Sequence, residues 1–413
     1  MDTLEQIKTF NFDALLRPDL PPPAARWNGF PKFNFVGGHN DADCVPVDGL
    51  IRAATTVLQR EGKTLSTYGL QSGPLGYRPL REFIAAKLAK DAAMRCSVDE
   101  ILITSGSLHG LDLVNAVLLS PGDTVIVERA TYGGAITRLT RLGVNIIGVA
   151  LDHDGLSASE LKKTLADLKS RGVRPKYIYT IPTVQNPTAT IMSEARRAAI
   201  LALTEEYDVP IFEDDCYADL TWNGARPRAI YAMAKDDRVI HIGSFSKSIA
   251  PALRTGFLVA SWPIMSRILA IKNDGGTGAL EQMVLAEYCA SHFDHHLVDL
   301  RKALRLKVEA MMDALRTHFG SDATFDDPAG GIFLWVTFPE KINTTELTRI
   351  ALQAGVAINP GVEWMTDTVA GQTRVRLCFA HPSELTIRAG VEQLAQISRV
   401  NFGIPAQRAP AHR

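Results

Sequence analysis

A lysine surrounded by serines follows a strongly apolar run near the middle of the chain. In the segment GSFSKSIAPALR, hydroxyls at Ser244, Ser246 and Ser248 flank Lys247, and Arg254 comes seven residues after the lysine. A lysine removed from water has a lowered pKa and becomes a nucleophile toward carbonyl groups. Serine hydroxyls and the planar fork of an arginine suit a phosphate. The segment predicts a carbonyl-binding lysine beside an anion site, with an exposed lysine in a polar loop as the alternative.

A glycine- and serine-rich turn offers a second place for an anion. The segment SGSLHG follows the apolar run EILIT and forms a turn between this strand and the next helix. The first N–H groups of a helix and its dipole attract anions. Such turns are common between strands and helices. This one gains weight because the expected fold brings it to the same sheet edge as Lys247.

An aspartate ends another apolar run, VPIFED, and a tyrosine follows three residues later. The carboxylate of Asp214 would be buried at this strand end and would need a cationic partner, for which a protonated pyridine nitrogen is suited. That pairing would make the ring an electron sink. A helix N-cap is the alternative role, and in the segment EDDCYAD Asp215 or Asp219 would serve it equally well.

Two more side chains that follow strands could contact a flat ring. Asn186, in QNPTA, can donate a hydrogen bond to a ring oxygen, and Tyr132, in ATYGG, can stack on the ring. An Asn-Pro turn and a packed loop tyrosine are the alternatives for these two residues.

Two arginines lie on one face of a late strand, TRVRLCFA. Strand alternation places Arg374, Arg376 and Cys378 on one face and apolar residues on the other. Arg376 can hold a substrate carboxylate in a bidentate pair. A salt bridge at the rim of the sheet is the commoner fate of a strand arginine and stays open as the alternative.

These side chains need a scaffold that brings strand ends together. Seven β-rich runs alternate with helical stretches, namely EILIT, TVIVE, NIIGV, KYIYT, VPIFED, RVIHIG and TGFLVA. This order predicts a largely parallel α/β sheet with helices on both faces. Ligands bind beyond the carboxyl ends of the strands in such sheets, which is where the polar residues lie.

The remaining segments predict a second, smaller unit. Helical patterns cover about 47–59, 79–90, 280–318, 344–354 and 382–398. Strands are expected in PAGGIFLWVTF, in a short run ending in INPG, and in TRVRLCFA. The Pro-rich start indicates an arm on a surface. We expect residues 1–70 to form this arm and part of a small domain, 71–300 a large domain, and 301–413 the C-terminal small domain.

Composition argues against several classes of protein. The formal net charge of −1 gives nucleic-acid binding no electrostatic support. No apolar run is long enough to span a bilayer, and the first residues lack the layout of a signal peptide. The five cysteines are scattered singly, which predicts neither a metal site nor a disulfide framework and favours a cytoplasmic location.

In order and spacing, these motifs resemble the class I and II aminotransferases, which are pyridoxal 5′-phosphate (PLP) enzymes of fold type I. The resemblance runs from about residue 33 to 398 and is closest to the branch of 2-aminoadipate and kynurenine aminotransferases. It implies an α/β fold whose large domain holds a mostly parallel seven-stranded sheet beside a smaller α+β domain. It also implies that Lys247 is the Schiff-base lysine and general base, with Asp214 at the pyridine nitrogen and Tyr217 at the phenolate oxygen.

The resemblance implies binding roles for further residues. Cofactor contacts are implied for Ser107, the backbone of Leu108, Tyr132, Asn186, Ser244, Ser246, Arg254 and, from the neighbouring subunit of a homodimer, Tyr68. Arg376 is expected to bind the substrate carboxylate, with Gly38 and Asn186 beside the substrate. The implied reaction moves an amino group from an L-amino acid to a 2-oxo acid by a ping-pong mechanism.

The chain departs from the family pattern at several places. Ala189 replaces the usual glycine of an Asn-Pro-Thr-Gly run, and Leu108 stands where relatives often have a polar residue. The loop GLQSGPLGY is longer than in many relatives, and Glu363 and Trp364 occupy positions where small or aromatic residues are more common. The last two departures lie near the expected substrate entrance and bear on substrate identity more than on cofactor binding.

Three alternatives stay open at this point. Another PLP reaction, such as a lyase, cyclase or oxidase reaction, could use the same scaffold, because pocket shape decides which bond breaks. A PLP-sensing regulator would need a DNA-binding domain ahead of this one, for which only about thirty residues are available. A purely structural α/β protein would fail to bind PLP.

Overall fold

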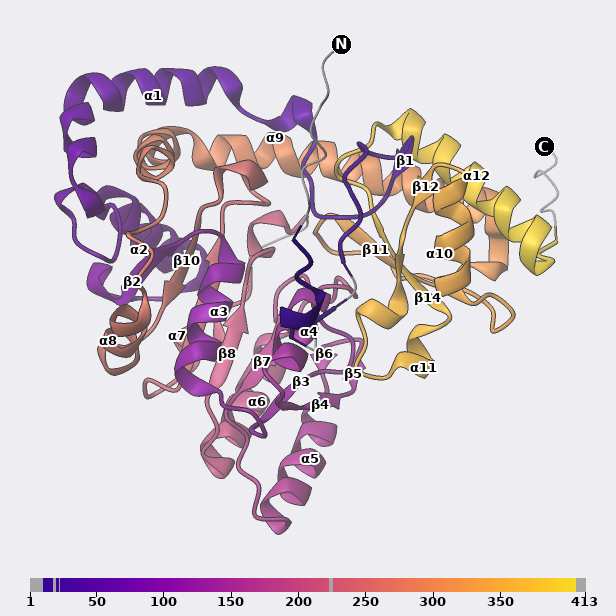
Figure 1. The fold of residues 1–413 in the computed structure, drawn as a ribbon, viewed down its shortest axis with the longest axis horizontal. Coiled ribbons are helices and arrows are strands. Elements are labelled where there is room, and N and C mark those ends of the chain that lie inside the picture. Colours follow the sequence, from indigo (N-terminus) through magenta and orange to yellow (C-terminus); the bar gives the residue numbers. More distant parts are fainter. Residues whose placement is uncertain (1–9, 18–19, 22, 223–225, 406–413) are drawn as a thin grey trace.

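The structure is a computed structural model that describes residues 10–17, 20–21, 23–222 and 226–405 (Figure 1). A seven-stranded sheet has the order β2-β10-β9-β8-β7-β3-β4. Its strands are β2 (Ile101–Thr104), β3 (Thr124–Glu128), β4 (Asn145–Val149), β7 (Ile178–Thr180), β8 (Ile211–Asp214), β9 (Val239–Ser244) and β10 (Gly256–Val259). Only β10 runs antiparallel to its neighbours, so the predicted seven strands and the mostly parallel sheet are confirmed.

Helices cover both faces of this sheet because side chains alternate along each strand. On β3, Val125 and Val127 pack toward one group of helices, whereas Ile126 packs toward another. The first group is α3 (Ser107–Leu118), α4 (Gly133–Arg141) and α8 (Trp262–Ile271); the second is α5 (Ala158–Ser170), α6 (Glu194–Tyr207) and α7 (Ile230–Met233). The strands are therefore apolar on both faces, which is why each reads as a continuous hydrophobic run.

One long helix, α9 (Ala279–Phe319), connects this sheet to the C-terminal part of the chain (Figure 1). At 1.5 Å per residue its 41 residues extend for about 60 Å. Its buried stripe includes Phe293, Leu297, Leu300 and Leu304, which recur at the spacing of one helical face. It packs against α1 (Val47–Glu61), α2 (Arg78–Ala92) and α12 (Glu384–Phe402).

The C-terminal part contains a small antiparallel sheet of β11 (Phe333–Thr337), β14 (Arg374–Cys378) and β13 (Asn359–Pro360). Helices α10 (Thr344–Gln353), α11 (Thr368–Gly371) and α12 lie beside it in Figure 1. Strand β1 (Phe33–Asn34) pairs with β12 (Val356–Ala357), so a segment from the start of the chain joins this part. A further hairpin, β5 (Leu151–Asp152) and β6 (Gly155–Leu156), follows β4.

The described part of the N-terminal segment exposes several large apolar side chains. Phe12, Leu15 and Trp27 are exposed, and Phe30 packs edge-on against His39 at a centroid distance of 5.1 Å. Residues 1–9 of the expected arm lie outside the described residues. No helix in the described ranges is both long and apolar enough to cross a membrane.

Candidate active site

A pocket of about 560 Å³ lies where the strands of the large sheet end and the C-terminal part begins. All the residues predicted for the site, except Tyr68, line it: Gly38, Ser107, Leu108, Tyr132, Asn186, Asp214, Tyr217, Ser244, Ser246, Lys247, Arg254 and Arg376. They come from segments more than 300 residues apart. The fold therefore brings to one place the side chains that the sequence places after separate strands, as expected for an α/β sheet.

Lys247 points into this pocket just beyond β9. Its Nζ donates a hydrogen bond to the carbonyl oxygen of Gly38 at 2.8 Å. A Cβ added at Gly38 would lie 2.3 Å from Nζ, so only glycine lets the lysine occupy this position. Burial lowers the pKa of Lys247, which favours the neutral, nucleophilic amine. The alternative of a lysine in an exposed loop does not fit this placement.

Arg254 and the start of α3 form an anion cradle on one side of the lysine. Gly106 precedes the helix with φ +78°, and a Cβ added there would lie 2.2 Å from Arg254 Nη2. Arg254 donates to the carbonyl oxygens of Ser105 at 3.2 Å and Pro251 at 3.1 Å. It forms no ion pair with a described carboxylate. A guanidinium bound only by carbonyls, next to a helix N-terminus, is suited to a phosphate.

Serines complete this cradle. Ser107, Ser244 and Ser246 line the pocket, and the backbone N–H of Ser246 donates to Ser244 Oγ at 3.0 Å. Ser248, also a candidate from the sequence, is buried and does not line the pocket.

Asp214 ends β8 on the pocket side. Its carboxylate accepts hydrogen bonds from the Tyr179 hydroxyl at 2.6 Å and from the Cys216 backbone N–H at 3.2 Å. Burial raises its pKa, because no described cation pairs with it. It caps no described helix, so the N-cap alternative does not apply. A protonated ring nitrogen would supply the missing positive charge.

A continuous chain of hydrogen bonds at the pocket joins Asn186, Tyr217 and Arg376. Asn186 Nδ2 donates to the Tyr217 hydroxyl oxygen at 3.1 Å, and Asn186 Oδ1 accepts from Arg376 Nη1 at 3.2 Å. All three side chains are buried. Both polar atoms of the Asn186 amide are thus held in place. Tyr217, predicted to contact a ring oxygen, and Arg376, predicted to bind a carboxylate, both hydrogen-bond to this one side chain.

Arg376 is a buried cation without a counter-ion among the described residues. Its Nη2 donates to the Gly37 carbonyl and to Asn359 Oδ1, both at 3.0 Å. Its guanidinium carbon lies 3.6 Å from the centroid of the Trp364 ring. Burial lowers the pKa of this guanidinium, as expected for an uncompensated charge. The structure therefore shows a fixed guanidinium facing a cavity and not a rim salt bridge.

An aromatic wall stands beside the arginine. The rings of Tyr132 and Trp364 lie 5.9 Å apart at an interplanar angle of 47°. Both line the pocket, as does Glu363. The unusual pair Glu363 and Trp364 is thus located at the cavity, where the sequence led us to expect an effect on substrate identity.

Tyr68 lies outside this pocket. Its side chain is 91% exposed and borders a second hollow that includes Gly275 and Thr277. Within one chain it has no role in the site. Its predicted contact with the phosphate of a neighbouring subunit stays a prediction.

Ala189 shows how the chain accommodates one departure from the family pattern. The residue adopts φ +61°, the left-handed conformation that glycine favours, and its N–H donates to the Gln185 carbonyl at 2.5 Å. Alanine in this conformation costs about 1 kcal/mol. The turn that presents Asn186 keeps its shape at that cost.

Sequence reasoning missed a buried carboxylate behind the asparagine turn. Glu128, at the end of β3, accepts hydrogen bonds from Thr180 Oγ1 at 2.6 Å, Gln185 Nε2 at 2.8 Å and the Ile181 N–H at 3.1 Å. Burial raises its pKa to about 7. The group ties Gln185, and with it Asn186, to the sheet. A carboxylate ending an apolar run was the available signal, as it was for Asp214.

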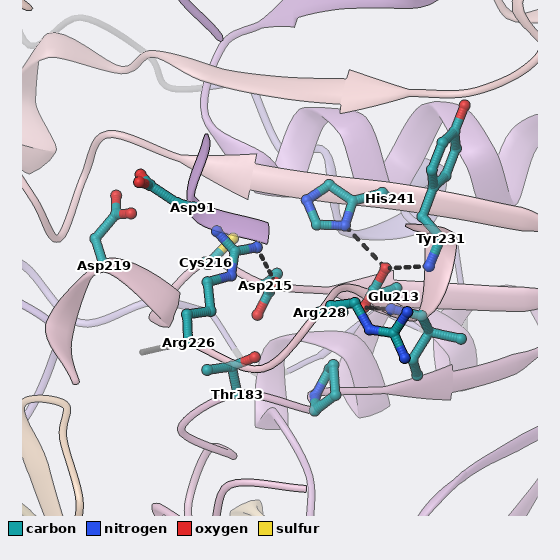
Figure 2. A network of polar contacts seen from close by, with 12 residues as sticks. Asp91, Thr183, Glu213, Asp215, Cys216, Asp219, Arg226, Arg228, Tyr231 and His241 are labelled. Carbon is teal, nitrogen blue, oxygen red and sulfur yellow. Dashed lines mark hydrogen bonds and ion pairs between the residues drawn. The ribbon is translucent and has the colours of Figure 1, made fainter. Parts of the chain in front are cut away.

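A second buried network lies on the opposite side of β8 from the pocket. Figure 2 shows Asp215 paired with Arg226, and Glu213 bound to His241 and to the backbone N–H of Tyr231. The Glu213–His241 contact is 3.0 Å and the Glu213–Tyr231 contact 3.1 Å. Because Glu213 and Asp215 flank Asp214, this network fixes the strand end that carries it.

Three side chains of this network, Glu213, Asp215 and His241, lie close enough together to hold a metal ion. Arg226 already neutralises Asp215, and Arg197 lies 3.9 Å from Glu213. With both carboxylates facing arginines, the arrangement is that of a charge-balanced structural network.

Removing Arg226 should destabilise the protein strongly. Arg226→Met leaves Asp215 buried without its partner, and we expect the free energy of unfolding to fall by about 3 kcal/mol. The control Arg228→Met, at a side chain 53% exposed, should lower it by less than about 1 kcal/mol. Urea denaturation measures both. Equal effects of the two variants would contradict a structural role for the Asp215–Arg226 pair.

Comparison with known proteins gives a consistent result. The family model described as aminotransferase class I and II matches residues 39–394. The chain is 31% identical to aromatic-amino-acid aminotransferase 1 of Thermococcus litoralis, covering 88% of this chain and 87% of that protein. It is 30% identical to the 2-aminoadipate transaminase of Thermus thermophilus, covering 88% of this chain and 89% of that protein.

A solved structure agrees with these relatives. The α-aminoadipate aminotransferase LysN of Thermus thermophilus, complexed with N-(5′-phosphopyridoxyl)-L-leucine, superimposes with a TM-score of 0.82 at 30% identity. The match covers 90% of this chain and 93% of that one. The similarity therefore extends over nearly the whole fold and reaches a structure that binds a derivative of PLP.

Proposed function

The chain belongs to the class I and II aminotransferases, and we propose that the pocket around Lys247 is its active site. It is a PLP-dependent enzyme of fold type I that transfers an amino group between an amino acid and a 2-oxo acid. The observation that carries the site assignment is the convergence of Lys247, Asp214 and Arg376 on one cavity, where neither Asp214 nor Arg376 has a described ion-pair partner. The family membership also favours transamination over the lyase, cyclase and oxidase alternatives.

The residues present fit the cofactor. Arg254 and the start of α3 would hold its phosphate, where glycine at position 106 leaves room that a Cβ would fill. Asp214 would hold a proton on the ring nitrogen. The positive ring would offset the cost of burying the carboxylate charge, which now raises the pKa of Asp214. Tyr132 would lie against the ring face. Ser107, Ser244, Ser246, Asn186 and Tyr217 supply the remaining hydrogen bonds.

The proposed mechanism assigns each step to a side chain of this protein. When bound, PLP supplies an electron-withdrawing ring that stabilises the charge left by a departing α-proton. Lys247 Nζ takes that proton from the amino acid and later returns it, for which its lowered pKa is suited. Arg376 holds the substrate carboxylate, which fixes the orientation of the α C–H bond. Asn186 hydrogen-bonds to both Arg376 and Tyr217 and so fixes their relative positions.

A homodimer would complete this site. Tyr68 is exposed, and the apolar side chains of Ile51 and Leu65, which precede it in the chain, are 58% and 42% exposed. These features support a subunit interface in which Tyr68 reaches the partner's cofactor phosphate. The molecular mass of the PLP-loaded enzyme in solution tests the dimer.

Other features of the whole protein are also proposals. The pairing of β1 with β12 supports a division in which residues 1–70 contribute to the small domain, 71–300 form the large domain and 301–413 the rest of the small one. Five unpaired cysteines support a cytoplasmic location. The partners we propose are small amino and 2-oxo acids, without a nucleic acid or a membrane.

The first experiment is a half-reaction with the PLP-loaded enzyme. A panel of amino acids is added without any 2-oxo acid while the visible absorbance is followed. Loss of the yellow band with one equivalent of the matching 2-oxo acid per site would support the proposed site and identify the donor. Release of ammonia or carbon dioxide without a stoichiometric 2-oxo acid would instead indicate a lyase or oxidase reaction.

A further inference from the structure

Glu363 is the charged side chain of the pocket to which the proposed mechanism gives no role. Lys247, Arg254, Asp214 and Arg376 also line the cavity, and each has a proposed partner in the cofactor or the substrate carboxylate. Glu363 adds a negative charge near the substrate end of the cavity. Glu363 is exposed, so its carboxylate is open to a positively charged or hydrogen-bond-donating group of a bound substrate.

Backbone contacts hold the turn that carries Glu363. Glu363 ends the short turn Gly361–Glu363, and the next residue, Trp364, accepts a hydrogen bond from the Thr131 N–H at 2.9 Å. A Cβ added at Gly133 would lie 2.4 Å from the Glu363 carbonyl oxygen. The C-terminal part of the chain is therefore attached at this turn to the loop that follows β3, which fixes the backbone of Glu363 beside the cavity.

One amide separates this carboxylate from the arginine that would bind the substrate. Asn359 Oδ1 accepts a hydrogen bond from Arg376 Nη2 at 3.0 Å, and Asn359 lines the pocket together with Glu363. No described lysine, arginine or histidine forms an ion pair with Glu363. The pocket thus presents a positive group and, one side chain away, an unpaired negative group.

We propose that Glu363 selects amino donors with a basic side chain, of the lysine and ornithine class. The inference rests on the proposed function, in which Arg376 holds the α-carboxylate. A donor bound there extends its side chain past Asn359 and places a distal ammonium against Glu363. A donor with a distal carboxylate, such as 2-aminoadipate, would place like charges together and bind less well.

Binding without turnover provides the first test. 6-Aminohexanoate is lysine without its α-amino group, and hexanoate lacks the distal amine as well. By calorimetry on the PLP-loaded enzyme, we expect 6-aminohexanoate to bind about tenfold more tightly than hexanoate, as a partly exposed ion pair allows. In Glu363→Gln the two should bind equally. In the control Glu392→Gln, which removes an exposed carboxylate from α12, the tenfold ratio should persist.

The outcomes are distinct. Tighter binding of hexanoate by the unchanged enzyme, or a preference for 6-aminohexanoate that survives Glu363→Gln, would overturn the proposal. Thermal unfolding of both variants shows whether the near-isosteric change has altered the fold.

Donor kinetics provide the second test and separate this inference from the proposed function. The half-reaction is measured with lysine, norleucine and 2-aminoadipate. We expect kcat/KM to be highest for lysine and lowest for 2-aminoadipate, and the lysine-to-norleucine ratio to fall about tenfold in Glu363→Gln. Failure of every amino acid to react would contradict the proposed function. Reaction of norleucine or 2-aminoadipate in preference to lysine would contradict only the role of Glu363.

Discussion

Replacing Lys247 by alanine should lower the rate of transamination by at least about 10⁴-fold while leaving the fold intact. Lys247 is the only amine among the pocket-lining side chains, so its loss removes both the group that binds the cofactor carbonyl and the group that moves the α-proton. The hydrogen bond from Nζ to the Gly38 carbonyl is the one described hydrogen bond of its side chain, so the shortened side chain leaves little else unsatisfied. The half-reaction with the preferred amino acid measures the loss.

The control for this experiment is Lys302→Ala, at an exposed lysine on α9. It removes the same functional group from a position remote from the pocket, and it should retain the rate. Thermal unfolding of the two variants should be similar. Turnover by Lys247→Ala at a rate within tenfold of the unchanged enzyme would reject the assignment. A small primary amine added to the inactive variant should restore part of the rate, because it can move the proton without being attached.

The sequence was most informative where a polar residue directly follows an apolar strand. Lys247 and Asp214 could be predicted for this reason, since a charge at the end of a buried run requires a special partner. The same signal was present at Glu128, which ends TVIVE, and would have identified it. The seven strands were also predictable, because burial on both faces makes each a continuous apolar run.

Residues that act through tertiary contacts could not be predicted from local pattern. Tyr179 lies within the run KYIYT and looks like an ordinary strand residue, yet its hydroxyl donates to Asp214. Arg226 follows a loop after β8, and nothing local distinguishes it from the exposed Arg228 two residues later. Their roles depend on the order of the strands in the sheet. Spacing along the chain does not reveal that order.

The distinction between Arg374 and Arg376 illustrates the same limit. Alternation places both on one face of β14, and this pattern alone does not distinguish them. Arg376 pairs in register with Trp335 on one side and Asn359 on the other, so it lies in the middle of the three-stranded sheet and faces the cavity. Arg374 begins the strand, and its side chain does not line the pocket.

Replacing Arg376 by methionine should lower kcat/KM for amino acids by about 10²–10³-fold, because a carboxylate entering the pocket would lose a desolvated bidentate partner. The cofactor should remain bound, since Arg254 and Asp214 are unchanged. Arg376→Lys should recover only part of the loss. An ammonium keeps the charge but cannot satisfy Gly37, Asn186 and Asn359 while offering two parallel donors to a substrate.

A matched pair of substrates separates loss of the carboxylate contact from general damage to the site. Pentylamine is norleucine without its carboxylate, so it cannot use Arg376. In the unchanged enzyme norleucine should react much faster than pentylamine, and in Arg376→Met the two rates should approach each other through a fall in the norleucine rate. If Arg376 served only to support Asn186 and Tyr217, both substrates would slow by the same factor and their ratio would be preserved. The ratio of the two rates therefore decides whether the Arg376 guanidinium binds the substrate or only orders the pocket.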